Sequence, residues 1–199
     1  MSNVGKSFWR ERLATYGFFP FWCDYEIEIK LDAHLKGAGY RGIKDVAKWM
    51  GQPYEERSRA HQAIYLEQEI QVMQEALSLL RGEKQGLIID TTGSVIYTGD
   101  ALMEELRKLS TIVLLDAPES LQDELYRAYI AEPKPVVWGE VYSPLPGETA
   151  EAALARCYPL LLQSRNWMYK RYADIILDYH ELRSQDFTTE DFLRKIGAI

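Results

Sequence analysis

Four short apolar runs, each ending in a polar residue, constrain the fold of this chain most. They cover residues 18–24, 86–90, 111–116 and 173–178. Continuous runs of isoleucine, leucine and valine without alternation are typical of strands that are buried on both faces of a parallel sheet. Because helical patterns separate the runs, and such alternation is typical of sheets with right-handed crossovers, the sequence predicts an α/β fold.

Helical patterns fill the stretches between the apolar runs. Apolar residues recur there at steps of three and four, which places them on one stripe of a helix. Thr188 and Asp191 stand three residues apart, as a helix-capping pair does. The expected helices cover residues 8–16, 26–35, 54–81, the stretch after Gly99, the stretch after Pro118, 148–171 and the stretch after Thr188.

Residues 131–147 break this alternation. They contain four prolines and two glycines, which is too many for a helix or a strand. A loop of this length inside a compact domain is usually functional or disordered. We therefore expect a lid in which Trp138 could close over a substrate. With no repeat or linker elsewhere, the sequence predicts one domain over residues 1–199.

Composition narrows the classes of protein to consider. A net charge of −7 without a basic run argues against a broad nucleic-acid-binding surface. No apolar run approaches the ~20 residues of a membrane span, and the first residues do not resemble a signal peptide. The only cysteines, Cys23 and Cys157, lack metal-ligand spacing, so reduced thiols and a cytoplasmic location are expected.

The triplet Gly5-Lys6-Ser7 matches the end of the phosphate-binding pattern G-x-x-x-x-G-K-[ST]. In such a loop, backbone N–H groups surround a triphosphate, the lysine reaches the outer phosphates and the hydroxyl binds Mg²⁺. An inert surface turn is the alternative. The first glycine of the pattern would lie one position before Met1, so we expect Met1 to be an internal residue of a longer natural chain.

Two further polar residues are candidates for the site. Asp90 ends the run at 86–90, and open α/β sheets bind ligands beyond the carboxyl ends of their strands. It is therefore a candidate Mg²⁺ ligand together with Ser7, unless it only caps the following turn. Arg165 lies on the otherwise apolar side of its helix. A buried arginine needs an anionic partner, which could be a substrate or an internal carboxylate.

Residues 2–179 resemble the shikimate kinase-like branch of the P-loop small-molecule kinases. Residues 2–7 are similar to the end of the family's phosphate loop, and residues 24–28 to the D-x-x-I-E half of its D-x-D-x-x-I-E stretch. Arg127 and Lys134 have the spacing of its two lid-region arginines. Arg165, followed by Tyr169, Ala173 and Asp174, is similar to its closing R-x-x-x-Y-x-x-x-A-D segment.

This resemblance implies a three-layer parallel sheet with flanking helices and a lid, here without the first central strand. It implies ATP and a small-molecule acceptor as partners, Mg²⁺ as cofactor, and phosphoryl transfer to a hydroxyl of a small anionic metabolite. Nucleotide binding would fall to Asn3, Val4, Gly5, Lys6, Ser7 and Arg127.

The resemblance also implies roles in catalysis and acceptor binding, each with a structural alternative. Asp24 would receive the acceptor hydroxyl, or only cap a helix. Lys134 would neutralise the transferring phosphoryl group, or only be solvated, and Arg127 could stack on adenine or lie on a surface helix. Thr92 and Gly93 would form the floor of the acceptor pocket, or could simply make a turn. Arg165 would be a further ligand of the acceptor.

Three departures from the family pattern bear on the substrate. Trp22 stands in place of the first aspartate of D-x-D, Leu66 in place of an arginine, and residues 91–94 in place of a glycine triplet. Loss of the arginine removes a charge-assisted grip on a carboxylate, so shikimate is not the expected acceptor. The alternatives are a degenerate P-loop module that binds nucleotide without kinase activity, and a nucleotide or nucleoside kinase.

Overall fold

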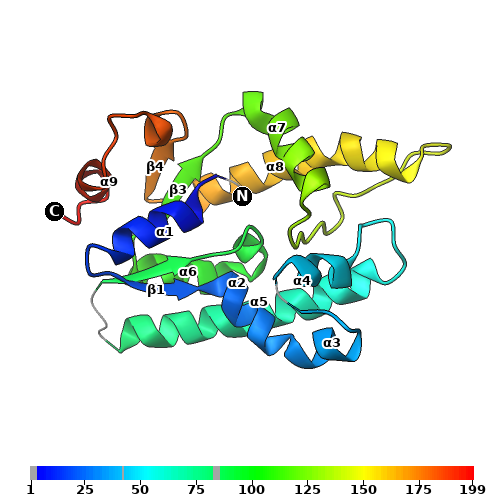
Figure 1. Ribbon diagram of the computed structural model, residues 1–199, viewed down its shortest axis with the longest axis horizontal. Helices are drawn as coiled ribbons and strands as arrows, with labels where there is room; N and C mark the ends of the chain where they lie inside the picture. The colour runs from blue at the N-terminus through cyan, green and yellow to red at the C-terminus, as the bar shows by residue number, and fades with distance from the viewer. Residues whose placement is uncertain (1–3, 42, 83–85) are drawn as a thin grey trace.

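The computed structural model describes residues 4–41, 43–82 and 86–199. Within them the four predicted strands are present as β1 (Phe19–Trp22), β2 (Leu87–Asp90), β3 (Val113–Asp116) and β4 (Ile175–Asp178). Each is shorter than its apolar run. The strands form two parallel pairs, β1 with β2 and β3 with β4 (Figure 1), where the pattern had suggested one sheet. The fold is thus mixed α/β with two small parallel sheets.

Helices make up most of the remaining structure. The long helix at 54–81 is confirmed from residue 58 onward, and those after Gly99 and Pro118 are confirmed at close to the expected positions. In the described residues the helices are α1 (Lys6–Ala14), α2 (Cys23–Lys30), α3 (Asp32–Gly37), α4 (Ile43–Met50), α5 (Ser58–Arg81), α6 (Asp100–Leu109), α7 (Gln122–Ala131), α8 (Ala150–Tyr172) and α9 (Thr189–Lys195), with short 3₁₀ turns η1 (Val95–Tyr97), η2 (Glu119–Leu121) and η3 (Glu181–Arg183).

Three details between β1 and α5 differ from the sequence prediction. The strand ends at Trp22, and Asp24 lies in the first turn of α2 instead of at the end of the strand. Acidic residues are favourable in a first helical turn because its N–H groups carry positive charge. The helix expected at 26–35 is two helices, α2 and α3, and α4 was not predicted at all.

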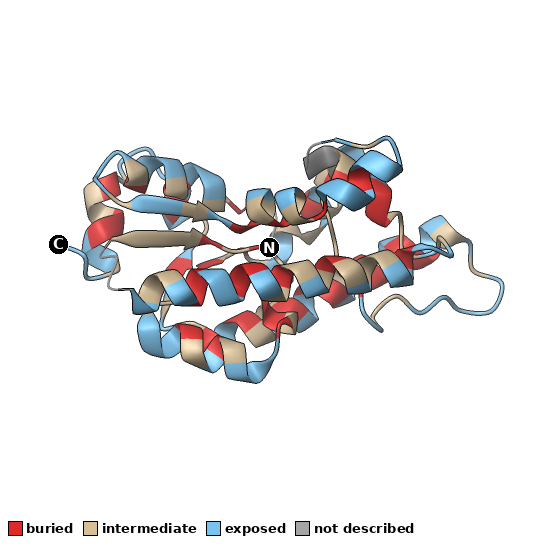
Figure 2. Ribbon diagram, turned by 90° about the horizontal axis from the view of Figure 1, so that it is seen from below, coloured by how far each residue is buried: buried red, intermediate tan, exposed pale blue. Residues whose placement is uncertain are grey.

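The helices cover the two strand pairs and pack on one another. Helix α1 packs against β1, β2 and α9, and α5 packs against α2, α4 and α6. Helix α8 packs against α6, α7 and β3. Figure 2 shows buried residues along the inner sides of the long helices and exposed residues along their outer sides. None of the helices in the described ranges has both the length and the apolar character that crossing a membrane requires.

Helix α9 begins with the predicted cap. The Thr188 hydroxyl accepts a hydrogen bond from the Asp191 N–H at 3.1 Å, and the Asp191 carboxylate accepts one from the Thr188 N–H at 3.0 Å. The capped helix places Phe192 on Trp9 of α1, with ring centres 4.5 Å apart in a stacked arrangement. This contact holds α1 against the carboxyl-terminal part of the chain.

Residues 132–149 form no helix or strand, as their prolines and glycines predicted. The segment is nevertheless anchored, because Trp138 is only 1% exposed and packs against Tyr129, Tyr142 and Tyr158. Its backbone N–H donates to Gln62 Oε1 at 2.7 Å. Trp138 is therefore a core residue here and does not line the cleft described below.

Candidate functional site

Residues from distant parts of the chain line one cleft of about 420 Å³. Because β1 and β2 are parallel, their carboxyl ends lie at the same edge, which brings the start of α2 close to the turn after β2. The amino end of α1, the 132–149 segment and η3 complete the walls. The lining residues are Gly5, Lys6, Ser7, Phe8, Trp22, Asp24, Thr92, Gly93, Lys134, Pro135 and Arg183.

The amino end of α1 is shaped by Gly5. This residue precedes the helix with φ of 101°, a left-handed conformation that glycine adopts without steric cost. The helix then starts at Lys6, and its first N–H groups and dipole favour an anion at this end. The side chain of Val4 is buried, so a role of this residue toward a nucleotide would use its backbone. Asn3 lies outside the described residues.

Asp90, the last residue of β2, lies against this helix. Its Oδ2 accepts hydrogen bonds from Ser7 Oγ at 3.3 Å and from Arg10 Nη1 at 3.1 Å. Its Oδ1 is buried and has no hydrogen-bond partner among the described residues. A buried oxygen without a partner, next to a hydroxyl, is an arrangement that suits a bound cation or water.

The protein alone offers few ligands for such a cation. No cluster of three or more His, Cys, Asp or Glu side chains occurs within residues 4–41, 43–82 and 86–199. Mg²⁺ is usually held by one or two carboxylates together with substrate phosphates and water. Ser7 and Asp90 could thus supply two ligands to a divalent cation, with water or a phosphate group supplying the others.

Asp24 faces the same cleft with an altered proton affinity. Burial raises the pKa of this half-buried carboxyl, and the charge of Asp90 raises it further. Lys6, Lys134 and Arg10 act in the opposite direction without cancelling the effect. A carboxylate with a raised pKa accepts a proton more readily, which is what a general base requires.

Lys134 brings a positive charge to the cleft from the 132–149 segment. Its Nζ lies 3.7 Å from Glu132 Oε1, and its side chain is 30% exposed. Together with Lys6 and Arg183, it gives the cleft three basic side chains against one carboxylate, that of Asp24. The lining charge therefore favours an anionic ligand.

The floor of the cleft is held by a buried carboxylate to which the sequence analysis assigned no role. Glu69 of α5 is 0% exposed and accepts hydrogen bonds from the hydroxyls of Thr92 and, at 2.6 Å, Ser94. Burial raises the pKa of Glu69 to about 7. The Tyr169 hydroxyl donates to the Gly93 carbonyl from the other side. The Thr92 hydroxyl thus points toward the protein interior and not into the cleft. Hydrogen bonds to Glu69 of α5 and Tyr169 of α8 hold the turn that contains Thr92 and Gly93.

Four residues that were predicted from the sequence, and that the structure describes, are not among the lining residues of this cleft: Val4, Asp90, Arg127 and Arg165. Arg165 is buried as expected, and its Nη2 donates to the Val137 carbonyl at 2.7 Å, while its Nε has no partner in the described part of the chain. It thus binds the backbone of the 132–149 segment. Arg127 is exposed on α7.

Two arginines that the sequence analysis did not consider do contact the site. Arg10 binds Asp90. The sequence could have indicated this contact, because Arg10 follows Ser7 by three residues and therefore lies on the same face of α1. Arg183 Nη1 donates to the Val4 carbonyl at 3.3 Å, and its guanidinium lies 3.8 Å from the centre of the Tyr179 ring. No local pattern marks Arg183, since its contact joins the two ends of the chain.

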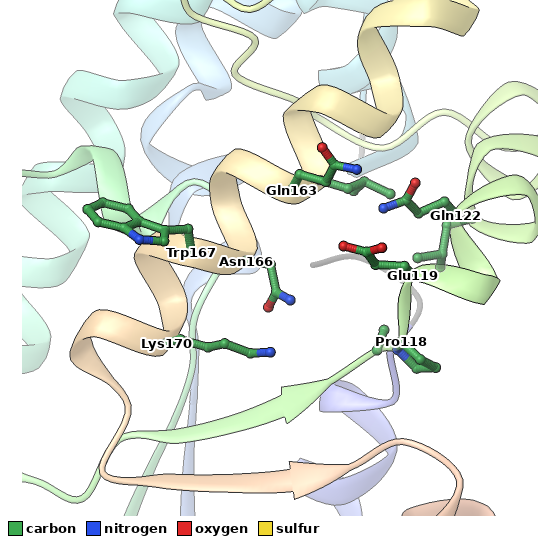
Figure 3. Close-up of a pocket in the computed structure, with 10 residues that line it drawn as sticks. Pro118, Glu119, Gln122, Gln163, Asn166, Trp167 and Lys170 are labelled. Atoms are coloured by element: carbon green, nitrogen blue, oxygen red, sulfur yellow. The ribbon is translucent and has the colours of Figure 1, made fainter.

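A second, smaller cavity of about 210 Å³ lies between the end of β3, α7 and α8. Figure 3 shows Lys170 of α8 extending toward Pro118, with Asn166 beside it. The Asn166 Oδ1 is buried and lacks a partner among the residues described. None of the residues predicted from the sequence lines this cavity, so it is not assigned to the same site.

Comparison with protein-family models and with curated proteins finds no match to this sequence. The functional interpretation therefore depends on the geometry above and on the motifs that it brings together.

Proposed function

We propose that this chain is an ATP- and Mg²⁺-dependent kinase that phosphorylates a hydroxyl of a small, anionic metabolite, as the resemblance to shikimate kinase-like enzymes implies. Phosphoryl transfer needs a phosphate cradle, a metal ion, cations and an oriented acceptor. The contact of Ser7 with Asp90 carries the proposal. These side chains are 83 positions apart, and their contact sets two potential Mg²⁺ ligands side by side, with Lys6 next to Ser7.

Each part has a residue in the cleft. Lys6 and the N–H groups at the start of α1 would bind the outer phosphates. Ser7 and Asp90 would hold Mg²⁺, which would neutralise phosphate charge when bound. Asp24 would orient the acceptor hydroxyl and take its proton, and its raised pKa supports this role. Lys134 would approach the transferring phosphoryl group from the 132–149 segment.

The nature of the acceptor is supported by the walls of the cleft. Lys6, Lys134 and Arg183 favour an anionic molecule, while Phe8 and Trp22 add apolar surface. The floor at Thr92 and Gly93 would present backbone groups to the acceptor, because the Thr92 hydroxyl is bound to Glu69.

The arrangement of the strands agrees with this proposal. Both strand pairs are parallel, as the strands of the proposed fold would be. The proposed three-layer kinase fold would then have α1 and α9 on one side and α5, α6 and α8 on the other.

A second candidate function is nucleotide binding without transfer. Arg10 is bound to the carboxylate that would hold the metal, and Trp22 stands where the family has an aspartate. Both features reduce the negative charge that is available to Mg²⁺ and favour a module that binds nucleotide as a signal.

The test measures ATP affinity by calorimetry and ATP consumption with a panel of hydroxy acids and polyols. Lys6→Ala should weaken ATP binding about tenfold or more, because it removes a charge that contacts phosphate. Lys36→Ala, which removes an exposed lysine paired with Asp32 on α3, should leave binding unchanged. Equal ATP affinity in wild type and Lys6→Ala would refute the proposal. Binding without transfer to any acceptor would support the second candidate.

A further inference from the structure

The ion pair between Arg10 and Asp90 is buried next to Ser7, which lines the cleft. Arg10 Nη1 lies 3.1 Å from Asp90 Oδ2, and the two side chains are 11% and 3% exposed. Because Arg10 follows Ser7 by three residues, both side chains leave α1 on one face and reach the same carboxylate oxygen. Shielding from water strengthens the Coulomb attraction within such a pair relative to a surface ion pair, while the desolvation of both charges offsets part of this gain.

Trp22 provides a second support for the guanidinium. It is the register partner of Asp90 in the β1–β2 pair, so both side chains project from the same face of that pair. The Arg10 Cζ lies 4.5 Å from the centre of the Trp22 ring, and Tyr25 stacks on Trp22 with ring centres 5.7 Å apart. Glu11 accepts a further hydrogen bond from Arg10 Nη2 at 3.2 Å. Arg10 is therefore fixed on Asp90.

This geometry places a permanent positive charge where the proposed metal ion would bind. The oxygen that accepts from Ser7 is the same one that Arg10 holds, and the other oxygen has no partner in the described residues. A divalent cation at Ser7 and Asp90 would meet the guanidinium at close range, and like charges in a poorly solvated site repel strongly.

We propose that Arg10 competes with the divalent cation for Asp90, so that Arg10 and its Trp22 support set the metal affinity of this site. The inference rests on the proposed function only in the identity of the metal site. Removing the charge of Arg10 should therefore strengthen metal binding even when no nucleotide is present.

The experiment measures Mn²⁺ binding without ATP or acceptor, from the loss of the electron-paramagnetic-resonance signal of free Mn²⁺. Arg10→Gln should bind Mn²⁺ about tenfold more tightly than wild type, or better. Arg12→Gln is the matched control, because Arg12 is exposed on the same helix and lies over the Phe8 ring instead. It should bind Mn²⁺ as wild type does. Adding Asp90→Asn to Arg10→Gln should abolish the gain.

A second variant covers the case in which Arg10→Gln does not fold. Trp22→Leu leaves the Arg10 charge in place but removes its aromatic support, and should give a smaller gain in Mn²⁺ affinity. Unchanged Mn²⁺ affinity in folded Arg10→Gln and folded Trp22→Leu would overturn the inference. A gain in Mn²⁺ affinity that survives the addition of Asp90→Asn would also overturn it. The kinase proposal fails by other measurements, namely ATP affinity and turnover, so the two failures are distinguishable.

Discussion

Replacing Glu69 by glutamine should change how the stability of the protein depends on pH. The carboxyl is fully buried beneath the cleft, and burial raises its pKa from 4.5 to about 7. The charge of Asp24 acts in the same direction, whereas Arg165 and the hydrogen bonds from Thr92 and Ser94 lower the pKa. The net effect is a carboxyl that holds its proton in the folded chain up to neutral pH.

The magnitude follows from proton linkage. Between 4.5 and about 7 the folded chain binds more protons than the unfolded chain, so the free energy of unfolding decreases as the pH rises. The stabilisation is complete below the unfolded pKa and is lost above the folded one. At about 1.36 kcal/mol per pH unit, the loss is about 3 kcal/mol. Glutamine has the same shape but no charge, so Glu69→Gln should lack this loss.

Urea unfolding of wild type and Glu69→Gln at about pH 5 and about pH 8 measures the effect. The variant should gain about 2.5 kcal/mol relative to wild type between these pH values, because about pH 5 already lies above the unfolded pKa of 4.5. The difference between the two proteins at each pH removes the titrations that they share, and reports Glu69 together with its electrostatic coupling to Asp24. Glu67→Gln, on the exposed side of the same helix, is the control and should show no gain. A pH-independent difference between wild type and Glu69→Gln would refute the reasoning.

Four further predictions concern the site, the core and a helix cap. Asp24→Asn should lower the transfer rate about 10²- to 10⁴-fold while ATP affinity is kept, because it removes the base; an unchanged rate would exclude that role. Wild-type activity should fall on the acid side at a pH above 3.8, since the Asp24 pKa is raised, and a pH–rate profile measures this. Trp138→Ala should destabilise the protein by about 3–5 kcal/mol in urea and speed proteolysis within residues 132–149; cleavage as slow as in wild type would contradict the anchoring. Thr188→Ala should cost about 1 kcal/mol through loss of the α9 cap, whereas the exposed control Ser120→Ala should cost little.

Much of the local structure could be predicted because it depends on residues that are close in sequence. The four apolar runs became four strands, and the periodic stretches between them became helices. The Thr188 cap was predictable because its partner, Asp191, is three residues away. The prolines and glycines of 131–147 likewise excluded regular structure there. The positions of Ser7, Asp24 and Asp90 near strand ends and a helix start also followed from the pattern.

Local patterns failed where two neighbouring elements compete for the same residues. Trp22, Cys23 and Asp24 belong to one polar-ended apolar run, yet the strand stops at Trp22 and the helix takes the other two. Trp138 lies among prolines, and this local pattern predicted that it belongs to a lid that closes over a substrate. Its burial among tyrosines of α7 and α8 depends on packing that the segment itself does not encode.

By itself, then, the sequence determined the four strands, most of the helices between them and the chemistry at several of their ends. Only the tertiary structure decided that the strands form two parallel pairs, and that Ser7 and Arg10 both reach Asp90. It also decided that Glu69 binds the turn at Thr92 and that Arg183 lies on the Val4 carbonyl. These contacts join side chains that are far apart in the chain, and their formation depends on how whole helices and strands pack, which no short-range pattern specifies.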